Sequence, residues 1–142
     1  MTFFAHSILG QPPDQWQPLH EHLAAAAHKA AEFAAAFGSG EWTLLCGLLH
    51  DLGKFSSAFQ QRLAGGRRVD HSLAGALEAI TYLESGPYAL LAKPIAHVIS
   101  GHHTGLADGV AGQSDAPSLK ERLAMADKIP DYSAWRGEIL LP

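Results

Sequence analysis

Residues 41–52, EWTLLCGLLHDL, are apolar on nearly every side of a helix and yet carry an ionisable pair, His50 and Asp51, near their end. A helix without a polar face belongs in the middle of a fold, where neighbouring elements cover all of it. An ionisable pair at the end of such a helix is costly to bury unless other groups compensate it. We therefore expect other elements to bring partners to His50 and Asp51. The simpler alternative is a helix-terminal pair in which Asp51 accepts backbone hydrogen bonds.

The hydrophobic pattern predicts further helices and no sheet. Helices are predicted over 56–63, 71–84 and 88–100, with a weak one over 119–129. Pro94 either kinks the third of these or marks the first turn of a shorter helix. The pattern predicts an all-α fold, with a glycine-rich loop over 101–118 and a tail over 130–142 that is too short to complete a domain. A first helix is predicted from apolar residues that recur at alternating steps of four and three, namely Leu19, Leu23, Ala26, Ala30, Phe33 and Phe37.

Glycine and serine residues mark the ends of the first two helices. Gly38 and Gly40 are predicted to end the first helix, and Ser39 is placed to cap the central one. Gly53 is predicted to stop the central helix in a left-handed turn, because glycine adopts that conformation without steric cost.

The composition favours one compact domain over residues 1–142. The chain has 142 residues, of which 47% are hydrophobic and 17% are charged, enough for one core and too few for two comfortable domains. A net charge of −4 gives no global attraction to nucleic acid, so such a contact would depend on a local patch or a partner. The single cysteine, Cys46, excludes an intramolecular disulfide and is expected to be a small buried side chain. No leader or span of roughly 18 apolar residues is visible, so we expect a cytoplasmic protein.

Five of the nine histidines fall where they could meet. With about 100° per helical residue, His22 lies about 60° from the centre of the first apolar face. His50 is in the last turn of the central helix, His71 begins a helix, and His102 and His103 come where a helix breaks into a loop. Neutral imidazoles with a bridging carboxylate bind first-row divalent ions well, which indicates a metal cluster. Taken alone, GHHTG also fits a loop with two exposed imidazoles, and the other histidines, His6, His20, His28 and His97, are expected to lie at the surface or in hydrogen bonds.

Five motifs resemble a known family, the HD-domain nuclease of CRISPR type I interference, which is the nuclease portion of the CRISPR-associated helicase-nuclease. They are FFAHS, LHEHLAAAA, GLLHDLGKFSSAFQQRL, DHSLAGA and SGHHTGLAD, and together they cover residues 3 to 108. HDLGK alone would identify only the broad HD superfamily of metal-dependent phosphohydrolases. The DHS motif and the paired histidines of GHHTGL are similar to the CRISPR branch.

This resemblance implies an HD-domain helical bundle with two metal ions and single-stranded DNA as the substrate. His22, His50 and Asp51 would hold the first metal, and Asp51 would bridge to a second metal held by His71, His102 and His103. His50 and Asp51 would also be catalytic, with Lys54 either contacting the phosphate or lying solvated after the helix. So many imidazoles favour manganese, iron, nickel or cobalt over magnesium, which prefers oxygen ligands. The CRISPR surveillance complex and a helicase region or subunit would be the partners, because the chain has no GxxxxGK[ST] motif.

One expected residue of this family has no confident match. Its members carry a late aspartate that completes the first metal site, for which Asp127 is a weak candidate, while Asp108 belongs to the loop motif. We expect the chain to be the N-terminal part of a longer protein or a naturally truncated one.

Two other functions remain open, and so does the role of three arginines. The chain is otherwise an HD-superfamily phosphohydrolase acting on nucleotides, or a truncated, metal-poor interaction module without activity. Arg62, Arg67 and Arg68 either line a path for a nucleic-acid strand or are solvated in a mobile loop.

Overall fold

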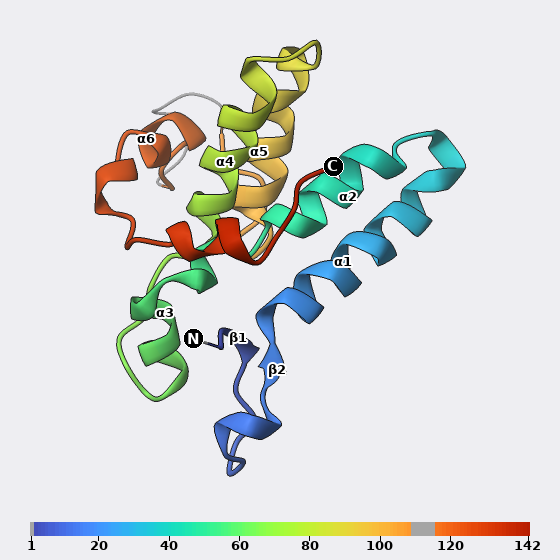
Figure 1. The fold of residues 1–142 in the computed structure, drawn as a ribbon. Coiled ribbons are helices and arrows are strands. Elements are labelled where there is room, and N and C mark those ends of the chain that lie inside the picture. Colours follow the sequence, from blue (N-terminus) through green and yellow to red (C-terminus); the bar gives the residue numbers. More distant parts are fainter. Residues whose placement is uncertain (1, 109–115) are drawn as a thin grey trace.

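The computed structural model describes residues 2–108 and 116–142, and within them the chain is mainly helical (Figure 1). The expectation of an all-α fold is confirmed, with one small exception that the sequence did not reveal. The two short strands β1 (Phe4–His6) and β2 (Gln17–Pro18) pair antiparallel and lead the chain into the first helix. None of the helices in the described ranges combines the length and the apolar character that crossing a membrane requires.

Helices α1 (Leu19–Ala34) and α2 (Gly40–Leu49) form a helical hairpin. A left-handed Gly38, with φ of 71°, ends a 3-10 turn between them, as expected. Ser39 occupies the position before α2, but its side chain makes no capping hydrogen bond. A Cβ on Gly47 would overlap the backbone of Ala27, so the two helices meet closely through small residues.

The predicted buried face of the first helix was partly wrong. The buried residues of α1 are Leu19, Leu23, Ala27 and Ala34, whereas Phe33 and Phe37 are 70% and 71% exposed. The close approach to Gly47 explains the difference, because it selects the alanine side of α1 for packing and turns the phenylalanine side outward. Cys46 forms no disulfide and lies partly buried against the core.

The central helix ends earlier than predicted, and for a different reason. Helix α2 stops at Leu49, and a 3-10 turn follows at Leu52–Phe55. The prediction of a left-handed Gly53 was wrong, because this residue does not have a positive φ. Glycine is needed there because a Cβ would overlap the backbone of His71. Helix α3 (Ser57–Leu63) begins next, with Ser56 accepting a hydrogen bond from the backbone N–H of Phe59.

Helices α4 (Ser72–Glu84) and α5 (Ala92–Gly101) lie side by side on the other side of α2 from α1 (Figure 1). Residues 85–91 connect them and include a 3-10 turn at Ala89–Leu91. Pro94 is in the first turn of α5, which decides between the two alternatives in favour of a shorter helix. Because α4 and α5 are antiparallel neighbours, the start of α4 lies near the end of α5.

The C-terminal segment packs on the core, contrary to expectation. Helix α6 (Leu119–Leu123) is short and is followed by 3-10 turns at Ala126–Lys128 and Ser133–Gly137. Trp135 and Ile139 are 7% and 8% exposed and belong to the main hydrophobic cluster, so the tail contributes to the core. Residues 109–115 of the predicted glycine-rich loop lie outside the described residues.

Candidate metal centre

The carboxylate of Asp51 lies at the middle of the candidate site. Asp51 follows the end of α2 and is 2% exposed. Its two oxygen atoms face different groups of side chains, and each group with Asp51 has its ligand atoms within 4.8 Å of one another. All six residues that the sequence suggested as metal ligands are brought together in this way, while their role as ligands stays a prediction.

The first group meets Oδ2 of Asp51. Nε2 of His22 lies 3.0 Å from this oxygen, and Nε2 of His50 lies 3.2 Å from it. The two Nε2 atoms are 3.2 Å apart. Nζ of Lys54 is 2.7 Å from the same oxygen and donates a further hydrogen bond to the carbonyl of Ala5 at 3.2 Å.

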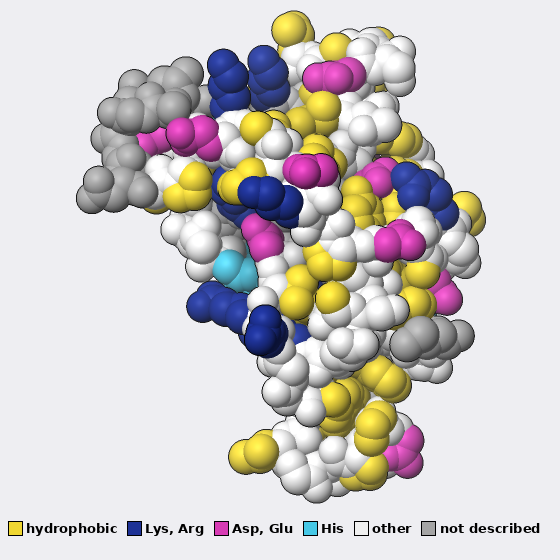
Figure 2. Space-filling model, turned by 90° about the vertical axis from the view of Figure 1, so that its left-hand side faces the viewer, with side chains coloured by type: hydrophobic (Ala, Val, Ile, Leu, Met, Phe, Trp, Pro, Cys, Tyr) yellow, Lys and Arg dark blue, Asp and Glu magenta, His cyan; other side chains and the backbone are white. Residues whose placement is uncertain are grey.

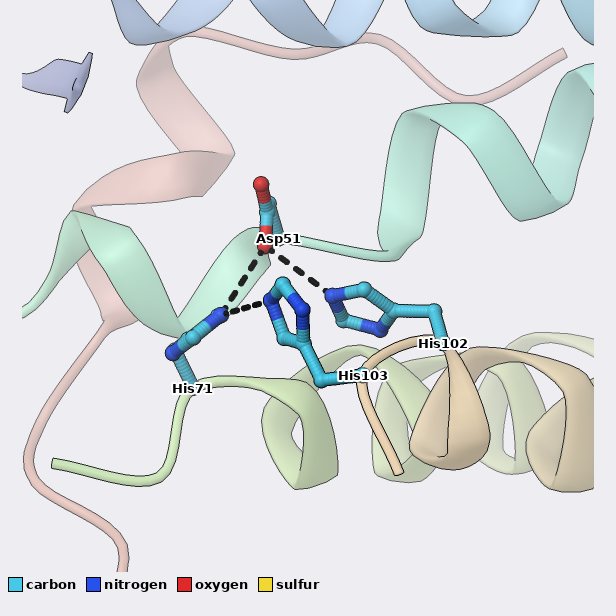
Figure 3. A group of neighbouring side chains, drawn as sticks. All are labelled: Asp51, His71, His102 and His103. Carbon is cyan, nitrogen blue, oxygen red and sulfur yellow. Dashed lines mark hydrogen bonds and ion pairs between the residues drawn. The ribbon is translucent and has the colours of Figure 1, made fainter. Parts of the chain in front are cut away.

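The second group meets Oδ1 of Asp51 (Figure 3). Nε2 of His71 and Nε2 of His102 lie 3.3 and 3.4 Å from this oxygen. Nε2 of His103 lies 2.9 Å from Nε2 of His71. Figure 3 shows His102 and His103 reaching the site from the end of α5 and His71 from the segment before α4.

The helix ends that carry the second group are tied together by Asp70 and Arg122. Oδ1 of Asp70 accepts hydrogen bonds from the backbone N–H and the hydroxyl of Ser72, which fixes the start of α4 directly beside His71. Arg122 from α6 donates to Oδ2 of Asp70 at 3.1 Å and to the carbonyl of Ser100 at 2.8 Å. Arg122 therefore joins the start of α4 to the end of α5, which carries His102. Nothing in the sequence around α6 points to this contact of Arg122.

Backbone carbonyls determine which ring nitrogens are available to a ligand. Nδ1 of His50 donates to the carbonyl of Gly47 at 2.7 Å, and Nδ1 of His102 donates to the carbonyl of Ile99 at 2.6 Å. In the neutral tautomer that these bonds select, Nε2 carries a lone pair, and it faces Asp51. This is the usual way in which a protein orients a metal-binding imidazole.

The donor set fits divalent cations. Two pairs of imidazole nitrogens, His22 with His50 and His71 with His103, approach to 3.2 and 2.9 Å. A ring that carries its proton on Nδ1, as His50 does, has a lone pair on Nε2, and a cation stabilises the close approach of such nitrogens. Oδ1 of Asp51 is buried and accepts no hydrogen bond from any described residue, although unsatisfied buried acceptors are rare. A cation on each side of the carboxylate would satisfy both requirements with ligands that first-row metals prefer.

A family comparison agrees with this geometry. The model of the HD domain matches residues 19–129, which span all six candidate ligands. The chain belongs to the HD-domain family. No curated protein matches the sequence. HD domains are metal-dependent phosphohydrolases that bind divalent metals, and the cluster of the His50–Asp51 pair and its neighbours fits such metal binding.

The electrostatics of this HD domain keep the bridging carboxylate ionised. Burial alone would raise the pKa of Asp51, but its contacts with His102 and the other three imidazoles outweigh burial and hold that pKa well below its ordinary value. Desolvation lowers the pKa of His102, but Asp51 and the Ile99 carbonyl outweigh it and raise that pKa overall. The carboxylate is therefore available as an anionic ligand over the physiological pH range.

Lys54 of this HD domain is not the solvated lysine that was one of the two alternatives. Its side chain is 3% exposed and forms an ion pair with Asp51. The reason is that the 3-10 turn at Leu52–Phe55 is buried beneath β1, whose Ala5 carbonyl accepts a hydrogen bond from Nζ. Contact between Lys54 and a substrate phosphate stays a prediction.

The other histidines and the late aspartate candidate lie outside the two groups. His20 and His28 are exposed and His97 is half-buried, as expected for residues away from a metal site. His6 is closer than predicted, because its ring meets the ring of His22 edge-on at 5.0 Å. Asp127 is exposed in the turn after α6 and belongs to neither ligand group among the described residues.

Proposed function

We propose that this HD domain is a metal-dependent nuclease that cleaves single-stranded DNA during CRISPR type I interference. A CRISPR surveillance complex would expose the strand and a helicase region or subunit would deliver it. The motifs FFAHS, DHSLAGA and GHHTGL support the CRISPR assignment, and the metal centre of the family supports the hydrolysis.

The observation that carries the proposal is the division of the site by Asp51. Each carboxylate oxygen faces its own imidazoles, and the second histidine of GHHTG, His103, contacts His71 in the group at Oδ1. Two cations bound in such a site polarise a phosphoryl oxygen, supply a nucleophile at neutral pH and stabilise the leaving oxygen. Asp51 would hold both ions at a fixed separation, and Lys54 would keep Oδ2 of Asp51 in place. Phosphodiester cleavage uses all of these features.

Cleavage of circular single-stranded DNA in the presence of Mn²⁺ tests the proposal. A circle has no ends, so its conversion to linear strands on a denaturing gel reports cutting within the strand. We expect cleavage by the wild type and loss of cleavage in His50→Ala and Asp51→Asn. His28→Ala is the matched control, because His28 is exposed and away from the site, and it should cleave as the wild type does. Equal cleavage by wild type and Asp51→Asn would contradict the proposal.

The same preparations distinguish the alternative activities. A phosphohydrolase specific for nucleotides would release phosphate or pyrophosphate from nucleoside phosphates and leave the circular DNA intact. An interaction module would bind fewer than two Mn²⁺ ions per chain in equilibrium dialysis and would show neither activity. This last outcome has a structural basis to test, because Asp127, the candidate for the late aspartate, is exposed outside the site.

A further inference from the structure

A cavity of about 740 Å³ opens beside the metal centre. His71 and His103, from the group at Oδ1 of Asp51, and Lys54 form the part of its wall that adjoins the site. Arg62 and Arg68 line the part contributed by α3 and the segment that follows it. The wall contains no acidic side chain among the described residues. The space next to the metal ligands is therefore positively charged, although the chain as a whole has a net charge of −4.

The two arginines of this cavity have no competing carboxylate. Lys54 is neutralised by Asp51, whereas neither Arg62 nor Arg68 forms an ion pair with a described residue. A guanidinium group without an internal partner is free to bind the oxygens of a phosphate. Figure 2 shows a histidine side chain at the surface beside a group of Lys and Arg side chains.

The part of the wall that carries Arg62 is a closed helix end. The N–H of Gly65 donates to the carbonyl of Arg62 at 3.0 Å, and the N–H of Gly66 donates to the carbonyl of Gln61 at 3.0 Å. With φ of 99° at Gly65, these bonds form a Schellman motif that closes α3. Of the three arginines considered together in the sequence, Arg62 is part of α3, as the predicted helix over 56–63 implies.

Phe59 couples this wall to the metal centre. Its ring is 1% exposed, and the guanidinium of Arg62 lies over it at 5.3 Å from the centroid. The ring of His71 meets the same ring edge-on at 5.0 Å. Arg62 and a candidate metal ligand are thus positioned by one buried aromatic side chain. Because Phe59 is buried, it offers no face on which a base could stack.

We propose that this cavity is a binding subsite for the phosphodiester backbone of a single strand of DNA, in which Arg62 and Arg68 bind phosphates next to the one at the metal centre. The inference rests on the proposed function and adds how the protein would bind a DNA strand in preference to a mononucleotide. Recognition through phosphates alone is independent of sequence.

Binding of a labelled single-stranded DNA 12-mer, followed by fluorescence anisotropy in the presence of EDTA, tests the subsite without cleavage. The variant Arg62→Gln/Arg68→Gln should reduce the salt dependence of log K by about 1.4, because each phosphate contact to a single strand contributes about 0.7. At 0.1 M salt this corresponds to about 20-fold weaker binding. Arg67→Gln is the matched control, because Arg67 is exposed in the same segment but does not line the cavity, and it should bind as the wild type does.

A second variant separates charge from packing. Arg62→Lys/Arg68→Lys keeps both charges and should retain most of the salt dependence, even if the packing of Arg62 on Phe59 is weakened. The subsite is overturned if the wild type does not bind the 12-mer or if the Gln variant binds it as the wild type does. It is also overturned if Arg67→Gln loses as much affinity as the Gln variant, or if a mononucleotide displaces the strand at equal phosphate concentration. Cleavage with Mn²⁺ is measured separately. Charge-dependent binding without cleavage would refute the proposed nuclease activity and leave the subsite intact. Cleavage by the wild type, with unaltered DNA binding in the Gln variant, would refute the subsite and leave the nuclease activity intact.

Discussion

Gly75→Ala should destabilise the protein even though alanine is the better helix former. Gly75 lies in α4 where this helix crosses the end of α2. A Cβ at this position would lie 2.8 Å from the carbonyl carbon of Leu49 and nearer still to its oxygen, whereas ordinary contacts begin at 3.4 Å. The helices would have to separate by about 0.6 Å or more, since the obstacle is backbone. Overpacking costs about 1 to 3 kcal/mol, against a gain of about 1 kcal/mol in helix propensity.

Because Leu49 immediately precedes His50, this displacement should reach the metal centre. A shift of about 0.6 Å exceeds the tolerance of about 0.2 Å within which metal–ligand distances are held. We expect a net loss of about 1 kcal/mol, or about 3 to 4 °C in Tm by circular dichroism at 222 nm, together with weaker Mn²⁺ binding by calorimetry. Gly86→Ala is the control, since a Cβ there meets nothing closer than 3.7 Å. A Gly75→Ala variant that is as stable as the wild type and binds Mn²⁺ equally well would refute the reasoning.

Three further predictions follow from the ligands, from Arg122 and from Cys46. Removing metal with EDTA should lower Tm, and added Mn²⁺ should restore it. At 100 times the Kd, Mn²⁺ should raise the free energy of unfolding by about 2.7 kcal/mol, and a Tm that changes with neither EDTA nor Mn²⁺ would contradict a bound cation. Arg122→Leu should cost about 1 to 3 kcal/mol in urea unfolding, because it leaves Asp70 and the Ser100 carbonyl without their hydrogen-bond donor. Arg136→Leu should cost less, because the Arg136 side chain is 58% exposed where it contacts Glu78 and the ring of Trp135. Burial raises the pKa of the Cys46 thiol from 9.0 to about 11, so at pH 8 the thiolate fraction and the rate of iodoacetamide labelling should be about 100-fold lower than in urea, and equal rates would contradict the burial.

The sequence predicted the site better than it predicted the packing around it. His50, His71 and His102 stand at helix ends, and helix ends can be read from periodicity and from glycine positions. Which ends meet was supplied by the resemblance, since periodicity gives no information on the order of helices in space. In the structure, Gly47, Gly53 and Gly75 allow neighbouring backbones to approach closely. From the sequence alone, a glycine needed for such an approach looks the same as a glycine needed for a turn.

The errors have the same physical origin. Phe33 and Phe37 continue the apolar period of α1, but the contact between Ala27 and Gly47 turns them outward. The tail was expected to be too short to complete a domain, yet Trp135 and Ile139 belong to the core, because burial depends on the partner surface and not on the length of the segment. For Lys54, a solvated position was one of two open alternatives, because the sequence does not show that its side chain pairs with Asp51 or donates to the carbonyl of Ala5 in a strand far away in sequence.

The most direct test of the metal centre is a crystal structure after soaking in Mn²⁺, with anomalous data collected near the manganese edge. Two anomalous peaks are predicted, one in contact with His22, His50 and Oδ2 of Asp51, and one in contact with Oδ1 and the imidazoles of His71, His102 and His103. No peak at Asp51, or a peak that contacts neither of its oxygens, would contradict the claim that this carboxylate joins two cation sites.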